Sequence, residues 1–156
     1  MPEAFAMTIE IILDDADVTI DVHPGQRLVR LAWKRAVPGP VYREVLLTLL
    51  EVVRQRNLKL WLSDGRRMGP ILYDDQVWTM KEYTPQVLQA GLERIAIVNS
   101  EDVMNQLAVD RMVNATPADA PYEIAFFQDP AIGQLWLMDP RRSGPKVETP
   151  KEEQRS

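Results

Sequence analysis

The feature that most constrains the fold of this chain is a change of hydrophobic period near residue 40. Ahead of it, apolar and polar residues alternate in three stretches, 8–13, 17–22 and 29–33. A period of two is typical of β-strands that bury one face. Beyond it, in "VYREVLLTLLEVVRQRN" at 41–57, apolar residues recur at helical spacing. The order of these patterns predicts an antiparallel meander followed by an amphipathic helix.

Three local expectations follow for this first half. Ile9, Ile11 and Leu13 are spaced two apart, so we expect them to share the buried face of the first strand. Asn57 is a candidate left-handed stop for the helix. His23 lies in "VHPGQ", where the Pro-Gly pair predicts an exposed turn.

Strands and helices alternate through the second half. Short apolar runs predict buried strands at 58–63, 94–98 and 122–127. Helices are predicted at 74–83, 84–91, 100–114 and 129–137. The links between the later strands are long enough for right-handed parallel crossovers. The sequence thus predicts an α/β fold: a mixed sheet of five to six strands with an antiparallel N-terminal meander, parallel βαβ crossovers and about four helices.

Polar residues mark the expected starts of three helices. Thr84, Ser100 and Asp129 each stand where a side-chain cap would be needed. Pro85 and Pro130 follow directly and suit a first helical turn, where a missing N–H costs nothing.

We expect a single domain over residues 1–138 and a disordered C-terminal tail over 139–156. A chain of 156 residues, 46% of them hydrophobic, can bury an ordinary core without disulfides or metals. Between Asp139 and Ser156 the sole large apolar residue is Val147, which is too little to offset the ordering entropy of the segment.

Composition argues against several classes of function. A net charge of -5 disfavours binding to nucleic acid. The absence of Cys and the presence of one His leave no thiolate nucleophile, sulfur metal site or His-rich metal cage. Residues 1–12 lack signal-peptide features, and no apolar run reaches the roughly 18 residues of a membrane span. We expect a cytoplasmic protein without membrane span, nucleic-acid partner, metal or cofactor.

The stretch "LWLSDGRRMGPILYDDQVWTM" at 60–80 most resembles a site. It is neither a Walker phosphate loop nor a nucleophile elbow. One interpretation is structural, with a strand, a glycine turn and an aspartate that caps the next helix. The other is a partner or ligand surface at the carboxyl edge of a parallel strand, where arginines would meet an anionic group. The residues assigned to this predicted surface are Asp64, Arg66, Arg67, Tyr73, Asp74, Asp75 and Trp78.

Three phrases carry a family resemblance: "YREVLLTLLEVVRQRNLKLWLSDGRRM", "AGLERIAIVNSEDV" and "YEIAFFQDPAIGQLWL". Over roughly residues 17–138 the chain resembles the STAS-like (SpoIIAA-like) superfamily of bacterial anti-sigma-factor antagonists, especially the divergent branch grouped with CRAL-TRIO lipid-binding domains. Its marks include the strand that ends at Asp64 and the terminal pattern of Phe127, Asp129 and Trp136. These are marks of a fold, so the resemblance implies architecture more than activity.

In the antagonist branch, a Ser or Thr at the start of the helix after this strand is phosphorylated, and the added charge controls binding of a partner kinase. Here Tyr73, Asp74 and Asp75 stand at that helix start, and Thr79 comes a full turn later. The resemblance therefore implies a regulatory module without the usual phosphorylation switch, in which Asp74 or Asp75 would hold a permanent negative charge.

Our first functional hypothesis is a non-catalytic regulatory or protein-interaction module. Its partner would be another protein or a second copy of the chain, because the opening strands leave a sheet edge that can pair. The sequence does not specify the identity of that partner.

Two further hypotheses stay open. One is binding of a small apolar ligand or lipid, because five large apolar residues lie close together in sequence; core packing is the alternative explanation. These residues are Met68, Leu72, Tyr73, Trp78 and Met80. The other is an enzyme with Asp64 or Glu82 as general base, which would need a raised carboxyl pKa in a cleft. Lacking a recognisable catalytic set, the chain is predicted not to be an enzyme.

Overall fold

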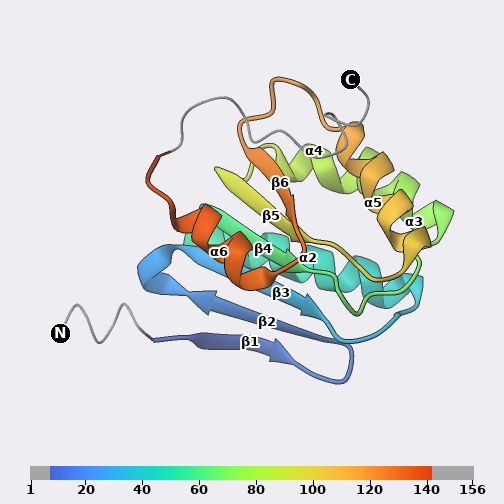
Figure 1. Cartoon of the computed structure of the whole chain (residues 1–156), viewed down its shortest axis with the longest axis horizontal. Helices are drawn as coiled ribbons and strands as arrows, with labels where there is room; N and C mark the ends of the chain where they lie inside the picture. The colour runs from blue at the N-terminus through green and yellow to red at the C-terminus, as the bar shows by residue number, and fades with distance from the viewer. Residues whose placement is uncertain (1–7, 142–156) are drawn as a thin grey trace.

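The protein contains one six-stranded mixed sheet in the strand order β1-β2-β3-β4-β5-β6 (Figure 1). We describe residues 8–141 of a computed structural model. The first three strands pair antiparallel, and β3 to β6 pair parallel. The strands are β1 (Glu10–Asp14), β2 (Val18–His23), β3 (Leu28–Trp33), β4 (Leu60–Asp64), β5 (Arg94–Val98) and β6 (Glu123–Phe127). The predicted fold class is confirmed.

Helices cover the two faces of the sheet unequally. The helices are α2 (Gly39–Arg56), α3 (Tyr73–Trp78), α4 (Thr84–Val87), α5 (Val103–Asn114) and α6 (Pro130–Met138), with a short 3-10 turn at Pro24–Gln26. A π-helical turn, Thr79–Tyr83, joins α3 to α4. Helix α6 lies alone on one face, and the other helices lie on the opposite face (Figure 1).

The larger core lies between the sheet and α2. Val18 and Ile20 of β2 and Leu31 of β3 are fully buried, as is Val53 of α2. Their alternation along the strands matches the period of two in the sequence. The helix ends at Asn57, whose φ of 52° gives the predicted left-handed cap.

The first strand departs from the predicted alternation. Its register with β2 shifts between Ile11 and Leu13, which marks a β-bulge. As a result Ile9 and Ile11 are exposed, whereas Ile12 and Leu13 are partly buried against the core.

The prediction of an exposed turn at His23 is wrong. His23 is the last residue of β2, is buried, and its Nε2 lies 2.8 Å from Asp21 Oδ1. The Pro-Gly pair does make a turn, but the turn begins one residue later, at Pro24.

Two predicted helix starts also differ from the structure. Thr84 has right-handed helical dihedrals and continues the helical path from α3 instead of capping a new helix. At α5 the cap is Asp102, which accepts from Asn105 N at 2.9 Å. Ser100 does not cap the helix itself; its Oγ accepts a hydrogen bond from the backbone N–H of Asp102, the capping residue, at 3.0 Å. The cap predicted at Asp129 is confirmed.

Arg94 fixes the end of α6, a role that the sequence did not reveal. It is a buried residue of β5, and its guanidinium donates to the carbonyl oxygens of Trp136, Asp139 (3.0 Å) and Arg141 (2.8 Å). A cation near the last carbonyls of a helix also complements the helix dipole. Residues 139–141, predicted as part of the tail, are thus bonded to the domain; the rest of that predicted tail, 142–156, lies outside the described residues.

We predict that Arg94→Leu lowers the free energy of unfolding by about 3 kcal/mol, because three carbonyls lose a charged donor in a buried place. Urea denaturation measures the change. Arg66→Leu is the matched control, since it removes an arginine from a largely exposed ion pair and should cost at most about 1 kcal/mol. Equal losses in the two variants would contradict the role of Arg94.

Candidate binding site

The loop after β4 is held firmly by the segment that precedes and begins α5. Ser100 Oγ donates to Met68 O at 2.7 Å, and Asn105 Nδ2 donates to Gly69 O at 2.8 Å. Both donors are buried. The predicted strand-to-helix corner at 60–80 therefore has a structural function: it joins β4 and α3 to α5.

Asp64 and Arg66 pair with each other. Arg66 Nε lies 3.0 Å from Asp64 Oδ1, and Arg66 Nη2 lies 2.9 Å from Asp64 Oδ2. This bidentate contact raises the pKa of the Arg66 guanidinium. The arginine that we predicted to meet an anionic group already holds a carboxylate of the chain, and Arg67 lies exposed beside it.

Asp75 lies in the interior and not on the predicted contact surface. Its side chain is 6% exposed, and Oδ1 accepts from Arg43 Nε at 2.7 Å. The carboxylate is packed against the start of α2, because a Cβ at Gly39 would lie 2.6 Å from Asp75 Oδ2. A negative charge at a helix N-terminus is favourable, so Asp75 ties α3 to α2.

The remaining members of the predicted surface separate. Tyr73 and Asp74 are exposed at the start of α3. Trp78 is partly buried and stacks on Tyr83, with ring centroids 5.5 Å apart. The guanidinium of Arg43 lies 5.3 Å from the centroid of the Trp78 ring. The predicted residues thus do not come together in one site: Asp64 pairs with Arg66, Asp75 is buried against α2, and the start of α3 is exposed.

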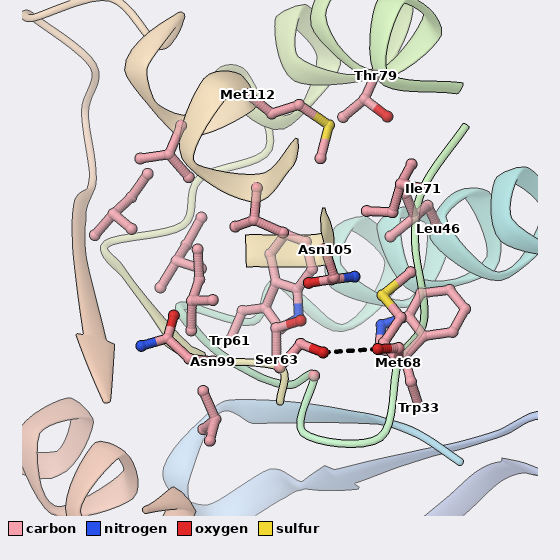
Figure 2. A pocket seen from close by; sticks show the side chains of 18 of the residues that line it. Trp33, Leu46, Trp61, Ser63, Met68, Ile71, Thr79, Asn99, Asn105 and Met112 are labelled. Atoms are coloured by element: carbon pink, nitrogen blue, oxygen red, sulfur yellow. Dashed lines mark hydrogen bonds between the residues drawn. The ribbon is translucent and has the colours of Figure 1, made fainter. Parts of the chain in front are cut away.

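A cavity of about 150 Å³ lies between the sheet and the helices of the larger layer (Figure 2). Strands β3 to β6 form one wall of the cavity, and α2, the α3–α4 segment and α5 form the other walls. Its lining side chains include Trp33, Tyr42, Trp61, Met68, Thr79, Tyr83, Ile97, Val109, Met112 and Ile124. Five apolar residues were predicted from the sequence to contact an apolar ligand. Of these five, Met68 alone lines the cavity, and Leu72 and Tyr73 are exposed.

The cavity exists because α5 packs loosely on the sheet. Ile97 of β5 and Ile124 of β6 point to this face but stay partly exposed. On α5, Val109 and Met112 are likewise only partly buried. The same sheet face is more closely packed under α2, where Val18, Leu31 and Val53 are fully buried.

Several hydroxyl groups on the wall are engaged within the protein. Tyr42 Oη lies 2.7 Å from Thr79 Oγ1, which donates to Asp75 O at 2.7 Å. Tyr83 Oη donates to Leu46 O at 2.7 Å. Burial raises the pKa of Tyr42 to about 12 and that of Tyr83 well above its usual value. Both phenols are neutral over the physiological range.

Trp61 has an unmet polar group at this wall. The residue lies on β4 and is 9% exposed, and its ring stands between the sheet and Asn105 of α5 (Figure 2). Its Nε1–H is buried without a hydrogen-bond partner. Among the described residues the other such atoms are Gln26 Oε1 and Arg94 Nε, and neither lines the cavity.

The wall can bind but has no catalytic set. It carries no Asp, Glu, His, Lys or Arg among its described lining residues, so a lining hydroxyl has no adjacent general base. Asp64 and Glu82, the carboxylates considered as bases, are not part of it. Within residues 8–141 no group of three or more His, Cys, Asp or Glu side chains could hold a metal.

A second hollow, of about 430 Å³, lies beside α6 on the opposite sheet face, and charged side chains stand among the apolar residues that line it. Its charged side chains pair with neighbours: Asp64 with Arg66, and Arg30 with Asp21 (3.4 Å). Arg30 also donates to Gln134 Oε1 at 3.4 Å. With its charges already matched, this hollow offers a weaker case for a ligand.

No family model, curated protein or solved structure matched the chain when it was compared with each. In the part of the chain that the structure describes, none of the helices has the length and apolar character needed to cross a membrane. The site must therefore be interpreted from its own chemistry.

The cavity could not be found from the sequence. Its lining comes from seven segments of the chain, and each apolar lining residue alone is an ordinary core residue. The available signal was weak: the predicted α5 pattern has polar residues Asn105 and Gln106 among its apolar ones, which indicates a helix that packs incompletely.

We predict that Gly39→Ala destabilises the fold, although Ala in place of Gly normally stabilises a helix by about 0.5–1 kcal/mol. The new Cβ would displace the Asp75 carboxylate, at a cost of about 1–3 kcal/mol. In an Asp75→Ala background the same change should be neutral or stabilising. A double-mutant cycle in urea measures the coupling; additive effects would contradict the contact.

We predict a loss of stability at high pH. An unfolded tyrosine has a pKa near 10, whereas burial raises that of Tyr42 to about 12. The contribution of the neutral phenol is therefore complete below about pH 10 and is lost as the pH rises toward 12. Urea unfolding across this range should show a shallower pH slope for Tyr42→Phe, while Tyr73→Phe, an exposed control, leaves the slope unchanged. Identical slopes for all three proteins would refute the assignment.

Proposed function

We propose that this protein is a non-catalytic binding domain that takes a small apolar molecule into the cavity between the sheet and α5. The observation that carries the proposal is an uncharged cavity of about 150 Å³, partly open to solvent, in an otherwise well-packed domain. Protein interiors normally contain few voids larger than a water molecule. Such a space costs packing energy, and occupation by a ligand would recover it.

The volume limits the ligand to about one ring or a short chain. An apolar cavity of roughly this size accepts benzene or xenon, as the engineered cavity of a lysozyme does. Drug-sized ligands need about 300–1,000 Å³. A full-length lipid would therefore need α5 to move outward.

Helix α5 is the part of the wall best suited to admit a ligand. Its buried residues are Asn105 and Ala108, and its other apolar residues are partly or fully exposed. Segments with few buried apolar contacts open at low free energy. The N-terminal end is anchored through Asn105 to Gly69 O, and the C-terminal half is anchored through Arg111 Nη1 to Gln76 Oε1, so opening requires one of these two contacts to break.

A second candidate function is a STAS-like regulatory module that binds a protein. The observation in its favour is a group of exposed large apolar side chains at the starts of α3 and α5. These are Leu72, Tyr73, Val103, Met104 and Leu107. Arg67 and Asp74 are exposed as well, and exposed apolar side chains accompanied by charged ones are a composition found at protein interfaces.

We predict that benzene stabilises the wild-type protein and fails to stabilise Val109→Phe. At a benzene concentration of about ten times Kd the stabilisation is about 1.4 kcal/mol, which raises Tm by roughly 3–5 °C for a chain of this size. A phenylalanine at position 109 should occupy the cavity instead. Differential scanning fluorimetry measures both proteins.

Val103→Phe is the matched control, because Val103 is an exposed valine on the same helix. It should respond to benzene like the wild type. A wild-type Tm that does not change with benzene, or an equal response in a folded Val109→Phe, would reject the cavity as the site.

The protein-binding candidate predicts that Leu72→Ser with Tyr73→Ser abolishes capture of a specific partner from a lysate of the source cell. Leu47→Ser, at an exposed leucine of α2, should leave capture intact. Unchanged capture by the double variant would reject this surface.

A further inference from the structure

The buried indole N–H of Trp61 indicates what kind of molecule the cavity takes. Trp61 lines the cavity and is 9% exposed, and its Nε1–H is buried without a partner. Buried polar groups in folded proteins are nearly always hydrogen-bonded, and an orphan donor calls for an explanation. A ligand acceptor in the cavity would supply the missing partner.

The charge of the wall restricts the ligand further. No described lining residue is charged, and an ionised group buried without a partner is strongly disfavoured. Carboxylates, phosphates and ammonium groups would enter at a large cost. The ligand therefore has to be neutral.

Three other donors on the wall are already used: Tyr83 donates to Leu46 O, Ser100 to Met68 O, and Asn105 Nδ2 to Gly69 O. Of the lining donors that the structure describes, Trp61 Nε1–H is the one that is both buried and without a partner. This places the polar end of the ligand against β4 and leaves its apolar part against Ile97 and Val109.

This inference rests on the proposed function. We propose that the ligand is a neutral compound of about one ring or a short chain that carries one hydrogen-bond acceptor, such as a ketone, ester or ether oxygen. This oxygen accepts a hydrogen bond from Trp61 Nε1–H. The apolar walls supply affinity, and Trp61 supplies the selection of the polar group.

The test is an NMR titration of the isotopically labelled full chain with three probes of similar size. Cyclohexanone carries an acceptor, methylenecyclohexane has the same shape without one, and cyclohexanecarboxylate carries a charge. The chain has four tryptophans, so Trp61→Phe identifies the Trp61 indole resonance. Trp33→Phe is the control, because Trp33 also lines the cavity but has no buried unpartnered nitrogen.

Cyclohexanone should move the Trp61 indole proton downfield, and methylenecyclohexane should not. Trp61→Phe should raise the Kd of cyclohexanone roughly tenfold more than that of methylenecyclohexane, as expected for one hydrogen bond. Trp33→Phe should change both values alike, and the carboxylate should not bind. If Trp61→Phe fails to fold, Trp→Phe variants at the other three tryptophans assign the Trp61 indole resonance by elimination, and its shift in the wild type is still measured.

Two results would overturn the inference, and they differ. If both neutral probes bind while the Trp61 indole does not move and their Kd ratio is the same in Trp61→Phe, the acceptor role fails and the apolar cavity site stands. If neither neutral probe binds, the proposed function itself fails. Binding of the carboxylate as tight as that of cyclohexanone would refute the requirement for a neutral ligand.

Discussion

The unequal packing of two helices on one sheet face is the constraint on which the candidate site depends. Under α2 the interior is filled by side chains such as Val18, Leu31 and Val53, which are fully buried. Under α5 the strand residues Ile97 and Ile124 stay partly exposed. The same sheet face thus carries a well-packed region under α2 and an incompletely packed region under α5. The region under α2 supplies most of the stability, so the region under α5 can remain incompletely packed.

Polar contacts keep the cavity open by fixing the elements that surround it. Asp75 joins α3 to α2 through Arg43, and Ser100 and Asn105 tie the loop after β4 to α5. These bonds are short and their acceptors or donors are buried, which fixes the positions of the elements that they join. Asp75, which the sequence suggested as a partner contact, thus holds α3 on α2 and does not line the cavity.

The fold could be predicted because its signals are local and periodic. Alternation in β2 and β3, the helical stripe of α2 and the left-handed stop at Asn57 all correspond to what is seen. The errors arose where tertiary contacts decide. His23 lies in the sheet, where its side chain contacts Asp21, and the Asp75 carboxylate packs against the start of α2. The role of Trp61 could not be predicted, because an unmet donor is a property of its surroundings and not of its place in the sequence.

The most direct test of the account is a crystal structure of the full chain under xenon pressure, since xenon enters dry apolar cavities of this size. The account predicts xenon density between β5 and α5, in contact with Trp61, Ile97 and Val109. Side chains that fill this space, or ordered water in place of xenon, would contradict the claim that the protein keeps an apolar site ready for a ligand.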